Sequence, residues 1–231
     1  DYGDAQSLAA LRRDVQMIFQ DPAGSLDTRQ SIGSAIMEPM KVHGIATGGD
    51  ARRRMERLLE RVGIDPARAD SLPHEFSGGH RQRICIARAL AMSPRLIIAD
   101  EAVSALYVTI KAQIIELMIG LQRELGLSYL FISHDMAAVE RICDRVAVMY
   151  FGEIVEIGAR DDVIGRPAHG YTRRLLSAIP ITHPEQRGTR PRQAADAGPP
   201  RSPIKPVGYA APPPRWRMLG DGHFIRDAVA T

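Results

Sequence analysis

Two adjacent carboxylates follow a short apolar run in the middle of the sequence. Residues 96–99 (LIIA) are continuously apolar, as in a buried β-strand, and Asp100 and Glu101 come directly after them. In an open α/β sheet, ligands bind at the carboxyl ends of the strands. A carboxylate pair there can hold Mg²⁺ and orient a water molecule, although a solvated strand end would show the same residues.

A serine and two glycines precede a segment with helical patterning that begins near His80. Ser77, Gly78 and Gly79 form this entry. Glycines at a helix start let an anion approach the free backbone N–H groups, and the helix dipole favours negative charge there. Ser77 adds a hydroxyl donor. An ordinary capped helix with a flexible entry would give the same pattern, so this feature alone does not establish an anion site.

Two further polar side chains follow apolar runs. His134 comes just after residues 129–132 (YLFI), a second predicted strand whose end would lie beside the first. His134 can then point at the same ligand as the carboxylates. Gln20 follows the apolar run 15–19, where its amide can reach a metal ion or a water molecule.

The elements that must position these residues alternate between strands and helices. Apolar residues at three- and four-residue steps predict helices, and paired β-rich runs around Phe151-Gly152 predict a hairpin. The helices are expected over 50–62, with Asp50 as cap, over 81–92 and over 108–125, and the hairpin strands over 146–150 and 153–157. This alternation predicts an α/β fold with a mainly parallel sheet.

The composition limits the class of protein. The 231 residues are 45% hydrophobic and 25% charged, as is ordinary for a globular protein. The sequence contains no run of about 18 apolar residues, the length that a transmembrane helix needs. The first twenty residues mix charges throughout, so no signal peptide is visible. Cys85 and Cys143 lack metal-ligand spacing. We therefore expect no disulfide framework and a cytosolic compartment.

Positive charge and proline gather near the C-terminus. The net charge is +3, and residues 181–231 alone carry eight Lys or Arg against four acids, with nine of the sixteen prolines. Residues 1–180 are therefore about neutral, so we expect no nucleic-acid partner. Because proline fixes φ and removes a donor, residues 181–231 are expected to build no ladders or long helices and to be partly disordered. A domain boundary is expected near Pro180.

Along the chain these motifs follow one another as Gln20, residues 76–80, residues 96–101 and His134. In that order they resemble the motifs of the ATP-binding subunit of ABC transporters, and the resemblance covers residues 11–180. Gln20 resembles the Q-loop glutamine, and residues 76–80 (FSGGH) resemble the signature motif. Residues 96–101 resemble Walker B followed by the catalytic glutamate, and His134 resembles the switch histidine. The D-loop position is occupied by Ser104, Ala105, Leu106 and Tyr107.

The resemblance implies a partial P-loop NTPase fold over residues 1–180, with a helical signature subdomain at about 30–95. It implies ATP and Mg²⁺ as cofactors. Asp100 and Gln20 would ligate Mg²⁺, while Glu101, His134 and Gln20 would act in hydrolysis. The signature residues Ser77, Gly78, Gly79 and His80 would clamp ATP held by a second ABC ATPase subunit, in a homo- or heterodimer.

Further residues resemble the peptide and nickel importer group. They are found in residues 19–26 (FQDPAGSL), 73–76 (PHEF) and 171–176 (YTRRLL), and residues 221–224 (DGHF) resemble the end of that group's proline-rich extension. The resemblance implies transmembrane permease subunits and, indirectly, an extracytoplasmic solute-binding protein as partners. It implies a peripheral location on the cytoplasmic side of the inner membrane. The extension lacks cysteine, so no iron–sulfur site is expected.

The sequence departs from the family pattern in several places. No Gly-Lys dipeptide exists, so the P-loop lysine and its phosphate-binding loop are missing, and we expect an N-terminally truncated subunit. His80 replaces the usual signature glutamine, residues 102–103 replace Pro-Thr, and Tyr107 replaces the D-loop aspartate. One alternative is a non-hydrolysing regulatory subunit that supplies only the signature motif in trans. A soluble ABC ATPase of DNA repair or translation would be expected to carry a long coiled-coil insertion or paired halves, and neither is present.

Overall fold

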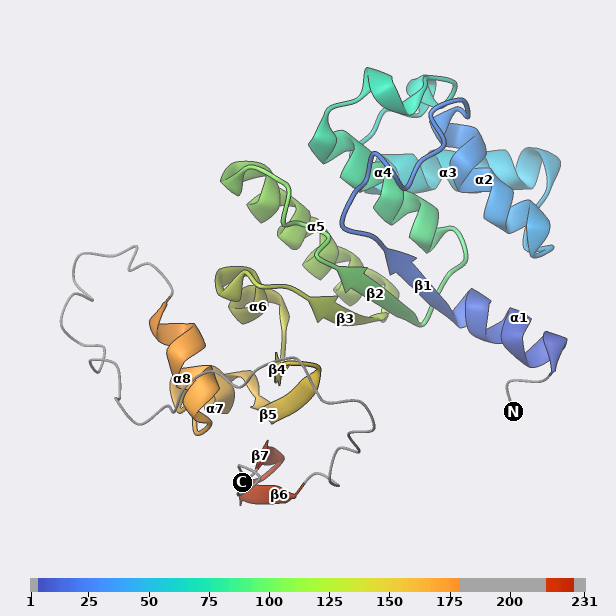
Figure 1. Cartoon of the computed structure of the whole chain (residues 1–231). Coiled ribbons are helices and arrows are strands. Elements are labelled where there is room, and N and C mark those ends of the chain that lie inside the picture. The colour runs from blue at the N-terminus through green and yellow to red at the C-terminus, as the bar shows by residue number, and fades with distance from the viewer. Residues whose placement is uncertain (1–3, 179–214, 227–231) are drawn as a thin grey trace, which may run out of the picture. The chain divides into compact units, whose positions relative to one another are not determined.

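The computed structural model describes residues 4–178 and 215–226. The chain forms two compact units, Asp1–Ala138 and Val139–Thr231 (Figure 1). The predicted boundary near Pro180 and most of the proline-rich segment lie outside the described residues. Within those residues, no helix is long and apolar enough to cross a membrane.

A parallel sheet forms the centre of the first unit. Strands β1 (Val15–Ile18), β2 (Leu96–Asp100) and β3 (Ser128–Ile132) lie in the order β1-β2-β3, and both pairings are parallel. Asp100 pairs with Ile132, so the ends of β2 and β3 are adjacent. The expectation of an α/β fold with a parallel sheet is therefore confirmed.

Five α-helices accompany this sheet in the described part of the first unit. They are α1 (Ala5–Asp14), α2 (Ile32–Val42), α3 (Gly48–Arg61), α4 (Gly78–Leu90) and α5 (Val108–Leu125), with the short helices η1 (Pro66–Arg68) and η2 (Pro73–Glu75) between α3 and α4. Helices α2, α3 and α4 contact one another, and α4 also contacts β1 and α5 (Figure 1). Their shared core includes Ile36, Met40, Leu59 and Ile84, each fully buried.

The two faces of the parallel sheet differ in burial. Ile97 and Ala99 of β2 are fully buried, as is Ile18 of β1, whereas Leu130 and Ile132 on the alternate face of β3 are 51% and 44% exposed. The continuous apolar runs 96–99 and 129–132 suggested strands buried on both faces; this is wrong for β3, and Leu96 and Ile98 of β2 are only partly buried. Parallel sheets normally carry helices on both faces. The described elements cover only the face formed by Ile18, Ile97 and Ala99.

A second, antiparallel sheet organises the other unit. Its strands β4 (Arg145–Tyr150), β5 (Glu153–Ala159), β6 (Trp216–Gly220) and β7 (His223–Arg226) lie in the order β4-β5-β7-β6, accompanied by α7 (Arg160–Gly165) and α8 (Gly170–Ser177). Helix α6 (Met136–Ile142) spans the division between the units. The predicted hairpin is confirmed, and Phe151 and Gly152 both have positive φ at its turn, as a two-residue type I′ turn requires.

The C-terminal hairpin β6–β7 corrects one expectation. Residues 181–231 were expected to build no ladders, yet β7 pairs with both β5 and β6. The reason is local, because residues 215–226 contain no proline and alternate around a turn at Asp221-Gly222. Glu156 of β5 is fully buried and accepts hydrogen bonds at 2.9 Å from the backbone amides of Ala168 and His169 and from His223 Nε2. This carboxylate therefore connects β5, β7 and the segment before α8.

Some helix boundaries differ from the sequence prediction. Helix α3 begins at Gly48, and Thr47 rather than Asp50 is its N-cap residue. Asp50 lies in the first turn, where the helix dipole stabilises its negative charge. Helix α4 begins at Gly78, three residues before the predicted start. Helices α1 and α2 were not predicted, and α2 contains Pro39, which weakens any sequence signal for a helix.

Candidate functional site

The candidate site is built around Glu101, which follows the last residue of β2. Glu101 has a left-handed backbone, with φ of 46°, where most residues other than glycine are strained. Its N–H donates to the Ile132 carbonyl of β3 at 2.9 Å, and its own carbonyl accepts from the amide and hydroxyl of Ser104 at 3.0 and 2.9 Å. These bonds on both sides hold the backbone turn that presents the carboxylate.

The Glu101 carboxylate lies between Gln20 and His134. Gln20 Nε2 donates to Glu101 Oε2 at 2.8 Å, and His134 Nδ1 lies 3.1 Å from Glu101 Oε1. The His134 side chain is 70% exposed and that of Glu101 is 29% exposed, so the group is open to solvent and to a ligand. The structure thus brings together three of the residues singled out from sequence, from the ends of β1, β2 and β3.

Asp100 is placed beside this group. It is the last residue of β2, is partly buried, and pairs in register with Ile132. Because side chains alternate along a strand, Asp100 shares the open sheet face with Ile98. Two carboxylates, from Asp100 and Glu101, therefore stand at the carboxyl end of the central strand.

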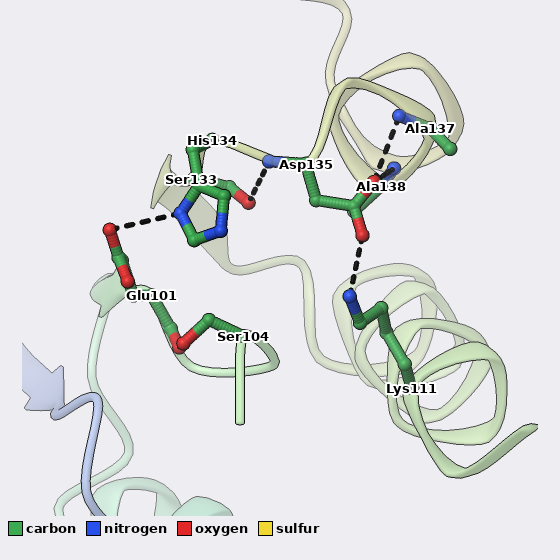
Figure 2. Close-up of polar contacts among 8 residues, drawn as sticks. All are labelled: Glu101, Ser104, Lys111, Ser133, His134, Asp135, Ala137 and Ala138. Carbon is green, nitrogen blue, oxygen red and sulfur yellow. Dashed lines mark hydrogen bonds and ion pairs between the residues drawn. The ribbon is translucent and has the colours of Figure 1, made fainter. Parts of the chain in front are cut away.

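The loop that carries His134 is held by residues that the sequence reasoning missed. Ser133 Oγ accepts from the Asp135 amide at 3.0 Å, and Asp135 Oδ1 accepts from the amides of Ala137 and Ala138 at 3.1 and 3.3 Å (Figure 2). Lys111 Nζ of α5 reaches Asp135 Oδ2 at 2.6 Å.

Asp135 is an anchored carboxylate rather than a free one. Burial opposes its charged form, but the hydrogen bond and charge of Lys111 and the amides of Ala138 and Ala137 outweigh burial and lower the pKa of Asp135. The sequence analysis singled out only His134 in this loop, and nothing in the sequence linked Lys111 to it. Lys111 and Asp135 together fix the position from which His134 reaches Glu101.

The signature residues lie at the N-terminus of α4. Ser77 is its N-cap and accepts from the His80 amide at 3.4 Å, while the His80 ring nitrogen Nδ1 lies 2.9 Å from Ser77 Oγ. A Cβ on Gly79 would come within 2.6 Å of Ile110 Cγ2, so a larger residue here would force the Ile110 side chain or α4 to shift. Among the described contacts, none joins Ser77–His80 to the group around Glu101.

The D-loop residues form the turn between β2 and α5. Ser104 supports the Glu101 backbone, as described above, and the Leu106 amide donates to the Val103 carbonyl at 3.3 Å. Tyr107 precedes α5 and is 87% exposed. The phenol in the aspartate position therefore faces solvent in this chain.

Two family models match the chain. The model described as ABC transporter matches residues 2–104, and the model described as oligopeptide/dipeptide transporter, C-terminal region, matches residues 155–203. The first match contains Gln20, the signature motif and Glu101. The second begins in β5.

Curated relatives include the glutathione import ATP-binding protein GsiA of Salmonella typhimurium (strain LT2), which is 54% identical over 221 residues. The protein of the same name from Escherichia coli (strain K12) is 56% identical over 218 residues. These alignments cover 96% and 94% of this chain but 35% of each relative. The chain therefore spans about a third of the length of the curated relatives it matches.

Solved structures share the fold. One is cbiO1 from Clostridium perfringens, part of the ABC transporter complex cbiONQ, with a TM-score of 0.63 at 29% identity, covering 72% of this chain and 64% of that one. Another is the dimeric ATP-binding cassette MJ0796 in a post-hydrolysis state bound to ADP and Pi, with a TM-score of 0.59 at 27% identity, covering 68% of each chain. Together with the two family models, these likenesses show that this chain belongs to the ABC transporter family, and its residues 155–203 match the C-terminal region of oligopeptide/dipeptide transporters.

Proposed function

We propose that this chain is part of an ATP-hydrolysing subunit that powers the import of peptides or similar solutes. The observation that carries the proposal is the Glu101 carboxylate held between Gln20 Nε2 and His134 Nδ1 at 2.8 and 3.1 Å. Phosphoryl transfer depends on positioning and charge stabilisation more than on covalent help from the protein. Three polar groups converging at the carboxyl ends of parallel strands suit that demand.

Each residue of the group has a distinct role in this proposal. Glu101 accepts a hydrogen bond from the attacking water and polarises it. His134 contacts the γ-phosphate from a loop fixed by the Lys111–Asp135 pair. Gln20 orients the water and, by resemblance to the Q-loop, senses the membrane subunit. Gln20 and His134 both contact Glu101, so the three side chains can act on the same water molecule and phosphate.

The residues present suit a magnesium ion. The carboxylate oxygens of Asp100 and the amide oxygen of Gln20 are hard ligands, and Mg²⁺ is usually held by one or two carboxylates together with substrate phosphates and water. Among the described residues, no group of three or more His, Cys, Asp or Glu forms a metal cage. This sparse donor set favours Mg²⁺ over a metal that needs an all-protein site. When bound, the ion neutralises phosphate charge.

The signature residues act on a different nucleotide. Ser77, Gly78, Gly79 and His80 bind the γ-phosphate of ATP held by a second ABC ATPase subunit, in a head-to-tail dimer. The support is that these residues form a helix start separate from the Glu101 group, with amides able to face an anion. The Ser77 hydroxyl also contacts the His80 ring at 2.9 Å, which places both side chains at this helix start.

Further partners follow from the importer proposal. The subunit works with transmembrane permease subunits and, indirectly, an extracytoplasmic solute-binding protein, at the cytoplasmic side of the inner membrane. The match to the C-terminal region of oligopeptide/dipeptide transporters supports the peptide importer group. A non-hydrolysing partner subunit is the second candidate, and the observation favouring it is Tyr107 in the D-loop, exposed where the family carries an aspartate.

One experiment separates these two candidates. Residues 1–231 are joined to a family N-terminal segment that carries a P-loop, and ATP binding and turnover are measured in the assembled transporter. Glu101→Gln is expected to retain ATP binding and to reduce turnover by about 100-fold or more, because an amide cannot polarise the water as a carboxylate does. Tyr107→Asp is expected to raise turnover by restoring the residue that aligns the composite site.

The control is Glu124→Gln on α5, which removes a carboxylate that pairs with Arg61 outside the site. It should leave turnover unchanged. If Glu101→Gln also leaves the rate unchanged and Tyr107→Asp has no effect, the site is not catalytic. The non-hydrolysing subunit then replaces the ATPase as the explanation.

A further inference from the structure

An arginine-lined groove lies in the first unit and shares no residue with the group around Glu101. It encloses about 350 Å³ and is lined by Arg54, Arg57 and Arg61 of α3 and by apolar residues that include Leu58, Leu90 and Leu125. This volume falls within the range of about 300–1,000 Å³ that is usual for small-ligand sites. The groove is therefore large enough for a small molecule and has both a charged and an apolar wall.

The three arginines share one face of α3. They recur at steps of three and four residues, so their side chains are neighbours on the helix surface. With a rise of 1.5 Å per residue, successive arginines stand about 5 Å apart along the axis and the outer pair about 10 Å apart. Like charges at this spacing repel one another, so the row is costly unless something negative lies against it.

Only part of this charge is compensated within the chain. Arg61 Nη2 pairs with Glu124 Oε1 of α5 at 2.9 Å. Arg54 donates to the neutral hydroxyl of Ser93. In the parts of the chain that the structure describes, neither Arg54 nor Arg57 contacts a carboxylate. Burial lowers the pKa of Arg54, and repulsion from Arg57 and Arg13 lowers it further.

Ser93 also lines the groove and lies in a constrained turn. It has φ of 50°, an unusual conformation for a serine, and its amide donates to the Leu90 carbonyl at 2.9 Å. The hydroxyl that Arg54 contacts therefore comes from a constrained turn. This turn fixes the Arg54 guanidinium at the groove rather than leaving it to extend into solvent.

We propose that this groove binds a phosphomonoester group carried on an apolar body. Arg54 and Arg57 present two uncompensated charges about one helical turn apart, which match a phosphate dianion. A carboxylate would balance only one of them. Guanidinium groups also fit phosphate oxygens in a bidentate manner. The apolar body lies against Leu58, Leu90 and Leu125.

The same chemistry occurs in a soluble phosphate ester and in the headgroup of a phosphatidic acid membrane. For the soluble source, the 231-residue chain is titrated by calorimetry at 0.15 M ionic strength with phenyl phosphate, inorganic phosphate and benzoate. For the membrane source, flotation is measured with phosphatidylcholine vesicles that contain or lack phosphatidic acid. We expect saturable binding of phenyl phosphate or of the phosphatidic acid vesicles, and weaker binding of the other probes in that set.

The variants assign the binding to the groove. Arg57→Gln and, independently, Arg54→Gln should each weaken binding about tenfold or more, the scale of a lost charge-assisted hydrogen bond. Arg52→Gln is the matched control, because Arg52 is on the same helix but pairs with Glu56 at 3.0 Å. This control should bind as the unchanged chain does.

Three results would overturn the proposal. The first is the absence of saturable binding in both the calorimetric and the vesicle experiments. The second is an equal loss in Arg52→Gln, which would indicate a general effect of positive charge. The third is unchanged binding in both Arg57→Gln and Arg54→Gln, which would place the ligand outside the groove. Circular dichroism is used to check that each variant is folded, since all three substituted side chains lie at the surface or groove.

Discussion

The carboxylate of Glu156 offers a sharp test of how the C-terminal hairpin is attached. Glu156 is fully buried, and its two oxygens accept three hydrogen bonds at 2.9 Å, from the amides of Ala168 and His169 and from His223. In Glu156→Gln one oxygen becomes an NH₂ group. Whichever way the amide turns, at least one of the three donors then faces another donor.

The size of the effect follows from these bonds. A donor left unsatisfied in a buried position costs about 1–3 kcal/mol, and the bonds that remain lose the strength that a charged acceptor provides. The free energy of opening β7 should therefore fall by about 2–4 kcal/mol, which corresponds to roughly 30- to 1,000-fold faster amide exchange. Hydrogen exchange measured by mass spectrometry over residues 223–226 checks this value.

The control lies on the same strand. Glu153 of β5 pairs with Arg226 of β7 at 3.3 Å but is partly exposed, so Glu153→Gln should change the opening free energy by less than about 1 kcal/mol. If Glu156→Gln exchanges no faster than Glu153→Gln, the buried carboxylate does not hold the hairpin and the reasoning is refuted.

The pH dependence gives an independent check of the same carboxylate. Burial opposes the charged form of Glu156, but the Thr172 hydroxyl nearby, the amides of Ala168 and His169 and the His223 bond outweigh burial and lower its pKa below the usual 4.5. The resulting stability is complete above pH 4.5 and is lost as pH falls through the lowered pKa. Exchange in β7, corrected for intrinsic rates, should accelerate below that pH, and Glu156→Gln should not show this acceleration.

The remaining predictions concern the first unit. Calorimetry with Mg-ATP should find weak binding or none to the 231-residue chain, since it has no Gly-Lys pair; a low-micromolar dissociation constant would contradict this. The apolar face with Leu130 and Ile132 should bind the dye ANS and favour aggregation, and a clean monomer that binds no dye and melts in one sharp transition would argue otherwise. Lys111→Met should raise the pKa of Asp135, because burial remains while the lysine is lost; carbon NMR of the carboxyl measures it, and an unchanged pKa would show that Lys111 does not anchor the loop.

Most of the candidate site could be predicted from sequence because it depends on short, ordered motifs. Gln20, Asp100 and His134 come just after three apolar runs. Because parallel strands have their carboxyl ends at one edge of the sheet, the proximity of these three residues could be predicted from the topology. The turn at Phe151-Gly152 was equally local.

Side-chain contacts between residues far apart in the sequence could not be predicted from such motifs. The Lys111–Asp135 contact joins residues 24 positions apart, and that between Glu156 and His223 spans 67. Neither pair has a spacing that a periodic pattern would reveal. The open sheet face was also missed, because a continuous apolar strand has the same sequence whether or not another element covers it.

The left-handed backbone of Glu101 has a consequence for how this position responds to mutation. A non-glycine residue in this conformation is strained by about 1–2 kcal/mol, and glycine would relieve that strain while adding about 0.5–1 kcal/mol of unfolded-chain entropy. Glu101→Gly should therefore fold at least as stably as the present chain, even though it removes the carboxylate that Gln20 and His134 contact. The melting temperature is therefore not expected to fall when Glu101 is replaced by glycine. A screen that selects only for folded variants would not select against this substitution. Folding gives no reason for a glutamate here, and only a demand on the side chain itself accounts for it.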